Sequence, residues 1–435
     1  MSAGTASPDL RPLLAINPHA PAELIAELGR RALPRVRAAA AANPSAAPDL
    51  LAKLATDEDD TVRRCVAANW SCPPECLTRL AYEHPHWIRV AVAANPGTEP
   101  GMVELLAVDD VDLVRGAVAG NPLCPQPVLL ALAADKERRV RDCALQNPEA
   151  PPEVLTTAYR SEVFTCRLLL AGNPAAPLDM LEELIGDPHA AVRVAVARNP
   201  HAPPALLARL AKDEDQMVKS TALRHPSVPY GLIVHTPASR NPVLRKAIAA
   251  NPMCLPQQLT TLAADDEPDV RRAAAGNPAL TAGGAFLLAG DGEETVRAAL
   301  AGNRSVPCPV LAELASDAEA LVRRRVAFNH AARPAFLDLL AGDVEPSVRG
   351  GVARHPAATA ATHRRLLADP VTAVREALAS GSRHEGVLTE LAAVAEQAAA
   401  DQATAEALAV PAEQAGQDEQ AGQAGRDEQG GPEVS

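Results

Sequence analysis

The chain has 435 residues, enough for two or three globular domains of ordinary size, but its composition argues against that arrangement. Aromatic residues make up only 2%, whereas a conventional core relies on them for buried area. The 47% of hydrophobic residues still allows a buried core, and 40 prolines indicate short helices broken at intervals. A net charge of −13 disfavours a protein that holds nucleic acid through its phosphates.

Neither a membrane span nor a secretion signal is visible in the sequence. No apolar run reaches the length of about eighteen residues that a membrane helix needs. Residues 1–9 lack the basic and apolar regions of a signal peptide. We therefore expect a cytoplasmic protein with no membrane contact, whose eight cysteines are reduced thiols.

After residues 1–9, which we interpret as an N-terminal extension, a 26-residue repeat runs to about residue 395. Its clearest mark is an Asn, replaced twice by His and followed in most repeats by Pro. We call these positions the Asn register: Asn17, Asn43, Asn69, Asn95, Asn121, Asn147, Asn173, Asn199, His225, Asn251, Asn277, Asn303, Asn329 and His355. A fixed period of this length predicts a solenoid, in which each unit buries its apolar face against its neighbours.

Two charged columns accompany the register. A basic residue stands six positions before the register in all fourteen repeats from Arg37 to Arg375. An acid stands twelve positions before it, except at Arg31, Ser161 and Ser239. Because the planar Arg side chain binds carboxylates bidentately, the paired columns favour an ion-pair ladder over a stripe that binds nucleic acid.

Each repeat is expected to contain two helices. In the unit that ends at Asn69, residues 48–55 form helix A, with Pro48 at its start and Leu50, Leu51 and Leu54 on one face. Helix B follows the acids at 57–60 and ends near residue 68. The Asn and the Pro that usually follows it stop this helix.

The string Leu50-Leu51-x-x-Leu54-Ala55-x-Asp57-x-x-x-x-Val62-Arg63-x-x-Val66-Ala67-x-Asn69 resembles two related repeat families. Its Asp-x4-Val-Arg part resembles a HEAT repeat. The Pro-x-x-Leu-Leu opening and the closing Asn-Pro, which other repeats carry, resemble the leucine-rich-repeat-variant family of bacterial proteins. The resemblance implies an all-α, right-handed α–α superhelix of about fourteen repeats, with helix A partly 3₁₀. It also implies a ladder between neighbouring repeats, formed by Asp57, Arg63, Asp109, Arg115, Asp135, Arg141 and their equivalents.

The third repeat holds an unusual set of metal-ligating residue types: Cys65, Cys72, Cys76, His84 and His86. Thiolates and imidazoles suit zinc, but this spacing matches no zinc motif. Equivalent slots in other repeats hold mostly apolar residues such as Ala, Val, Leu and Met, so buried thiols are the favoured interpretation. We expect no metal and no cofactor; one family member carries an iron–sulfur cluster in a Cys-rich segment that has no counterpart here.

The same part of the chain supplies candidates for partner binding. Trp70, Tyr82 and Trp87 cluster in sequence, and Trp87 shares a variable column with Leu113. A second variable column, five positions before the register, includes Arg64 and by analogy faces a ligand. Aromatic anchors are enriched at binding hot spots, although the same residues could instead fill a gap between repeats.

Residues 396–435 are rich in Ala, Gln, Glu and Gly without an apolar period, which predicts a disordered acidic tail. No catalytic motif is present, so we expect a non-enzymatic scaffold or adaptor that binds protein, with a monomer favoured. The alternatives are a nucleic-acid-binding HEAT-like protein and a metal- or redox-sensing scaffold centred on the third repeat.

Overall fold

The computed structural model describes residues 9–31, 33–83, 85–159 and 163–424, with side chains up to residue 404. These residues form thirty α-helices and one 3₁₀ helix, and no strand occurs among them. The prediction of an all-α solenoid built from two-helix repeats is confirmed. No helix in the described part of the chain is long and apolar enough to cross a membrane.

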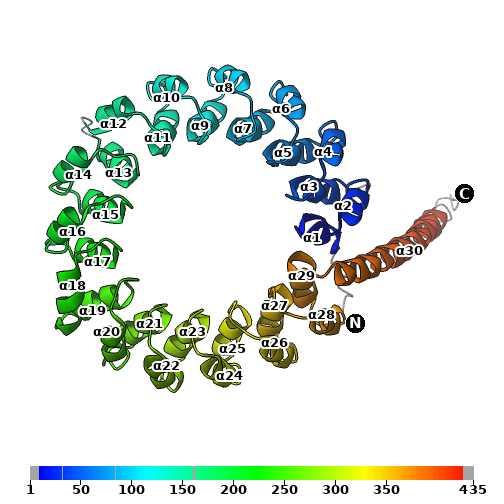
Figure 1. Cartoon of the computed structure of the whole chain (residues 1–435). Coiled ribbons are helices and arrows are strands. Elements are labelled where there is room, and N and C mark those ends of the chain that lie inside the picture. Colours follow the sequence, from blue (N-terminus) through cyan, green and yellow to red (C-terminus); the bar gives the residue numbers. More distant parts are fainter. Residues whose placement is uncertain (1–8, 32, 84, 160–162, 425–435) are drawn as a thin grey trace, which may run out of the picture.

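The repeats form a closed ring around a central opening, with even-numbered helices outside and odd-numbered helices inside (Figure 1). The outer helices are α2 (Ala22–Leu28), α4 (Pro48–Leu54), α6 (Pro74–Leu80), α8 (Pro100–Leu106), α10 (Gln126–Leu132), α12 (Pro152–Tyr159), α14 (Leu178–Leu184), α16 (Pro204–Leu210), α18 (Tyr230–His235), α20 (Pro256–Leu262), α22 (Ala282–Ala289), α24 (Cys308–Leu314), α26 (Pro334–Leu340), α28 (Ala360–Leu367) and α30 (Glu385–Ala424). The inner helices are α1 (Arg11–Ile16), α3 (Pro34–Ala42), α5 (Asp60–Ala68), α7 (His86–Ala94), α9 (Asp112–Gly120), α11 (Arg138–Gln146), α13 (Phe164–Gly172), α15 (Ala190–Arg198), α17 (Gln216–Arg224), α19 (Pro242–Ala249), α21 (Pro268–Gly276), α23 (Glu294–Gly302), α25 (Ala320–Ala327), α27 (Pro346–Arg354) and α29 (Thr372–Gly381).

Local sequence sets the boundaries of these short helices. In α4, Pro48 occupies the first helical position, where its missing N–H costs nothing. In α5, the Asp59 carboxylate caps the helix by accepting from two backbone N–H groups. The extended backbone of Asn69 then ends α5. Helices of seven to nine residues are too short to be stable alone, so packing between repeats holds them.

The curvature follows from the different sizes of the inner and outer side chains. Inner helices meet through small, fully buried residues such as Ala41, Ala67 and Ala93, which let neighbouring backbones approach closely. Outer helices bury leucines such as Leu51 and Leu77 and stand farther apart. Fifteen inner helices close a full turn at 360/15, or 24° per repeat. With layers about 10 Å apart, this angle requires an outer spacing about 4 Å larger than the inner spacing.

A composite repeat closes the ring, with its outer helix from one end of the chain and its inner helix from the other. The first turns of α30 bury Val387, Leu388, Leu391 and Ala392. Their spacing repeats that of residues 50, 51 and 54 in α4 and of Ala55, which caps it. Helix α1 contacts both α29 and α30, and one continuous buried cluster spans all three helices. We call this junction the seam.

Two details differ from the sequence-based expectation. The outer helices are α-helical, and the described 3₁₀ helix is the single turn Thr236–Ala238 that follows α18, where Pro237 interrupts the α-helical bonding. The segment expected to be a disordered tail continues as helix to Ala424. Its abundant Ala, Glu and Gln are strong helix formers, and the α30 turns packed in the seam provide a nucleus for it.

Candidate functional site on the inner wall

Each register Asn ties its repeat to the preceding one. The Asn69 side chain donates from Nδ2 to the carbonyl oxygens of Ala41 (2.7 Å) and Asn43 (2.8 Å). Its Oδ1 accepts from the backbone N–H of Ser71 at 2.8 Å. The side chain is buried and its bonds satisfy backbone groups at two helix ends. The sequence indicated only a helix stop here, because the bond partners belong to another repeat.

The two register histidines reproduce part of this pattern. In His225, Nε2 lies 3.0 Å from the Asn199 carbonyl oxygen, and Nδ1 accepts from the Ser227 N–H at 3.0 Å. His355 makes the equivalent pair of contacts with Asn329 and Ala357. These contacts require a neutral ring that donates from Nε2. Burial lowers the pKa of both histidines, although the bond to the carbonyl opposes the shift.

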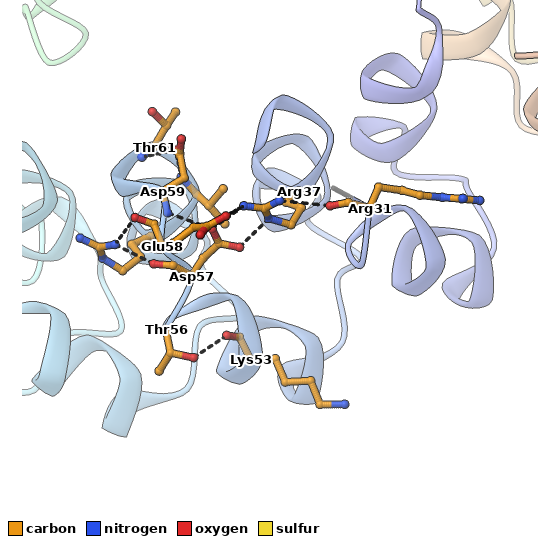
Figure 2. A network of polar contacts seen from close by, with 10 residues as sticks. Arg31, Arg37, Lys53, Thr56, Asp57, Glu58, Asp59 and Thr61 are labelled. Atoms are coloured by element: carbon orange, nitrogen blue, oxygen red, sulfur yellow. Dashed lines mark hydrogen bonds and ion pairs between the residues drawn. The ribbon is translucent and has the colours of Figure 1, made fainter. Parts of the chain in front are cut away.

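The basic column forms a ladder that runs around the ring. Figure 2 shows Arg37 between the carbonyl oxygen of Arg31, in its own repeat, and the carboxylate of Asp57 in the next one. Its Nε and Nη2 donate to the two Asp57 oxygens at 2.7 and 2.8 Å. The same pairing joins Arg89–Asp109, Arg115–Asp135, Arg167–Asp187, Arg193–Asp213, Arg245–Asp265, Arg271–Asp291, Arg297–Asp317, Arg323–Asp343 and Arg349–Asp369.

The ladder weakens where the acid column is interrupted or lengthened. Arg63 meets the longer Glu83 at 3.4 Å and donates to the carbonyl oxygen of Asp57 at 2.6 Å. Arg141 donates to the carbonyl oxygens of Asp135 and Lys136, and its acid slot, Ser161, lies outside the described residues. Of the six residues named from the family resemblance, five form ladder contacts between repeats, and the described bonds of Arg141 stay within its own repeat.

The guanidinium groups of the ladder use most of their donors in bonds within and between repeats. The bond from Arg115 lowers the pKa of Asp135, and burial opposes it by a smaller amount. The same pair raises the pKa of Arg115. A bidentate guanidinium that also donates to a backbone carbonyl has few donors left for a phosphate. Any nucleic-acid contact would have to come from other cations.

The cysteines of the third repeat are free thiols, and Cys72 and Cys76 lie apart from any group of metal-ligating side chains in the described part of the chain. Cys72 and Cys76 lie side by side and buried, whereas Cys65 is half-buried on α5. Burial raises the pKa of Cys72 to about 12, and the neighbouring Cys76 adds to the shift, so a neutral thiol is favoured. Among the described residues, which exclude His84, no group of three or more His, Cys, Asp or Glu is placed to hold a metal ion.

The structure separates the candidates for partner binding into two groups. Trp87 and Leu113 hold equivalent positions on the neighbouring inner helices α7 and α9, and Arg64 lies on the inner helix α5. Trp70 and Tyr82 lie in the loops at opposite ends of the outer helix α6. Both are exposed, Trp70 by 81%. A single small ligand on the inner wall would therefore meet the first group and not the second.

The inner wall is formed by residues eight, five, four and one positions before the register. This spacing places them on one face of each inner helix. Counted from the fourteen register positions and from Gly381, the equivalent position in α29, these columns hold ten basic and four acidic residues. Seven of the basic residues lie in the arc from α15 to α27, where Asp269 is the acid: Arg198, Arg224, Lys246, Arg272, Arg324, Arg325 and Arg354. The wall is thus locally cationic in a chain of net charge −13.

A cavity of about 750 Å³ lies on this arc, and we call it the inner groove. It crosses α17, α19, α21, α23 and α25, and its lining includes Met217, Arg224, Val243, Lys246, Arg272 and Arg325. This groove was not predicted as a site from the sequence. The sequence does carry a sign of it: Met217, Val243 and Leu321 are apolar and stand in the same column, eight positions before the register, as Trp87 and Leu113.

Three solved structures similar to this chain share 10–13% of its sequence. They are Kap95p, whose binding induces the switch loops of RanGDP to adopt the GTP-bound conformation (11% identity, TM-score 0.25), Kap121p bound to Nup53p (10%, 0.25) and importin beta (13%, 0.20). The matches cover 86%, 89% and 86% of this chain and 51% of each of theirs, so the chain spans about half their length. TM-scores of this size do not establish a shared fold, and the solenoid assignment rests on the repeat geometry itself.

Comparison with protein families identifies the repeat. No curated protein matches the chain. Residues 190–215, which comprise α15, its register Asn and α16, match the family model described as leucine rich repeat variant. That segment carries the same Arg, Asn-Pro and Leu-Leu positions as the other repeats. The predicted resemblance to the leucine rich repeat variant family is therefore confirmed.

Proposed function

We propose that this protein is a non-enzymatic scaffold that binds a protein partner on the inner wall of its ring. The observation that carries the proposal is a contrast between columns. The ladder and register positions are nearly identical in every repeat, whereas the inner-wall positions differ from one repeat to the next. A wall with changing side chains suits a partner that does not itself repeat.

The dimensions of the ring are consistent with enclosing a partner. Fifteen inner helices spaced about 8–10 Å apart give a ring about 40–50 Å across between opposite helix axes. Subtracting a helix width of about 10–12 Å leaves an opening of about 30–40 Å, close to the diameter of a small domain.

The eight cysteines are free thiols, which supports the expected cytoplasmic location.

Site-specific photo-crosslinking in cells tests this proposal. A benzophenone amino acid at Met217, on the inner wall, should capture one discrete protein. The matched control is Leu339 on the outer helix α26, because the two side chains are exposed by 60% and 58%. Equal capture at both positions, or capture only at Leu339, would contradict an inner-wall site. A further probe at Trp87 tests the second part of the wall.

Nucleic-acid binding is the second candidate, and the cationic arc from α15 to α27 favours it. Two observations weigh against it. Lys246 and Arg272 both pair with Asp269 at 2.7 Å, which neutralises part of the arc. Exposed Met217, Val243 and Leu321 lie among the cations, and apolar side chains add little to phosphate binding. Retention of the chain on duplex DNA at physiological salt would favour this candidate instead.

A further inference from the structure

We propose that the inner groove binds an extended, acidic peptide segment that also carries apolar side chains. The inference rests on the proposed function and deepens it, because it assigns both a place on the wall and a chemistry to the partner. It follows from the charge, the apolar surface and the length of the groove.

The charge of the groove selects an acidic ligand. Four cations, Arg224, Lys246, Arg272 and Arg325, face two acids, Glu267 and Asp269. Asp269 accepts from both Lys246 and Arg272, so these three groups share one surplus positive charge. No carboxylate within the described part of the chain forms an ion pair with Arg224 or Arg325. Their donors are therefore available for carboxylates of a ligand.

The apolar side chains favour a peptide over a polyphosphate. Met217, Val243 and Leu321 are exposed and occupy the same column on α17, α19 and α25. Small residues such as Ala247 and Ala273 lie beside them in the lining, which leaves room for a ligand side chain. Burial of a ligand Leu or Met side chain against this surface removes apolar area from water and so favours binding. A phosphate backbone has no group that would gain from it.

The length of the groove sets the size of the segment. Five neighbouring inner helices span four spacings of about 8–10 Å, or about 32–40 Å. An extended chain covers about 3.3–3.6 Å per residue, so roughly nine to twelve residues cross the groove. A cavity of this volume lies within the ordinary range for ligand sites, about 300–1,000 Å³.

Fluorescence anisotropy with a labelled dodecapeptide of alternating Glu and Leu tests the inference on the full-length protein. We expect saturable binding that weakens with salt. Replacing every Glu of the peptide by Gln, or introducing Arg224→Glu with Arg325→Glu in the protein, should reduce the affinity about tenfold or more. The control variant, Lys53→Glu with Lys212→Glu, makes the same charge change at exposed positions outside the groove and should leave binding unchanged.

Three results would overturn the inference: equal binding by a peptide with Lys in place of Glu, equal loss in both charge-reversal variants, or tighter binding of a 20-base-pair DNA duplex. These failures are distinguishable from failure of the proposed function. If crosslinks still form at Met217 or Trp87 but the acidic peptide fails, the ring remains a scaffold and its ligand is not acidic. If crosslinks fail at every inner position, the proposed function fails with it.

Discussion

The seam and the body of the ring solve the same packing problem with different means. Within the body, neighbouring repeats share a chain connection, the register Asn bonds and, at most junctions, an Arg–Asp pair. At the seam the Asn bonds remain, because Asn17 donates to the carbonyl oxygens of Ala379 (2.8 Å) and Ser382 (3.1 Å). The ladder pair is absent there among the described residues: Arg375 donates instead to Asp369 and Thr372 of its own repeat.

This difference indicates which interactions close the ring. Buried apolar contacts and the register Asn occur at both places, so we infer that they provide most of the closure. The Arg–Asp pair and the chain connection strengthen a junction that packing already defines. Arg31, which stands in an acid slot near the seam, pairs with Glu27 and with Glu396 of α30, and these half-exposed pairs contribute little. We therefore expect the seam to be the first junction to open.

The largest effect should come from shortening a buried leucine at the seam. Leu388 in α30 and Leu51 in α4 are both fully buried at equivalent positions. Replacing either by Ala should cost about 2–5 kcal/mol. Leu388→Ala should also open the ring and raise the radius of gyration in small-angle scattering, whereas Leu51→Ala should leave it unchanged below the melting temperature. Similar scattering changes in both variants would show that the seam is not distinct.

Removal of one register Asn should be nearly as costly. Asn277→Ala deletes three hydrogen bonds and leaves buried carbonyl groups unpaired, which should cost about 2–3 kcal/mol in chemical denaturation. Asn277→His should lose less, because His225 and His355 show that an imidazole fits the slot with two of these contacts. If the Ala variant were as stable as the His variant, the hydrogen bonds of the register side chain would not contribute to holding neighbouring repeats together.

Acid should weaken the chain near the seam. His363 is buried, with Nδ1 3.0 Å from the Ser382 hydroxyl, and burial lowers its pKa to about 4, with a smaller contribution from His384. Its folded pKa lies below the unfolded one, so stability is complete above about pH 6.5 and is lost as the pH falls toward 4. At pH 5 the loss is about 2 kcal/mol. His363→Gln should flatten this part of the pH profile, and an unchanged slope would contradict the assignment.

The ladder should show the smallest effect. Arg323 binds Asp343 through two parallel bonds, at 2.6 and 3.0 Å. Arg323→Lys keeps the charge but loses the fork, so we expect a loss of about 1 kcal/mol in thermal unfolding. Arg375→Lys, where no carboxylate is paired in the described structure, should cost less. If Arg375→Lys lost more stability than Arg323→Lys, the Arg–Asp pairs of the ladder would add no stability beyond that of side-chain packing.

Most of the fold could be predicted from the 26-residue period of the sequence, because each two-helix unit is specified by its own residues. Residues 48–69 define both helices, their caps and the buried face. The closed ring was not predictable in this way. It depends on a step of 24° accumulated fifteen times, and a few degrees of change in packing would leave an open superhelix. One local signal for closure existed: Val387, Leu388, Leu391 and Ala392 repeat the apolar spacing of an outer helix.

The candidate site was predictable only where a single repeat specifies it. Single-residue columns pointed to Trp87 and Leu113 as candidates for partner binding and to Arg64 as facing a ligand, and the structure places all three on inner helices. The groove arises only when residues 26 positions apart are brought together by five helices. Charge showed the same limitation, because the net value of −13 concealed a cationic inner arc. The structure, not the composition, shows where those charges lie.

Ring closure is tested most directly by energy transfer across the seam. His19 and Arg383 are exposed and line one small cavity there, although 364 positions separate them in the sequence. Donor and acceptor dyes attached through azide-bearing amino acids at these two positions should show nearly complete transfer in the free protein. An open arc of fourteen repeats, about 110–140 Å along its contour, would hold the dyes far apart. Low transfer in the intact chain would therefore contradict a closed ring.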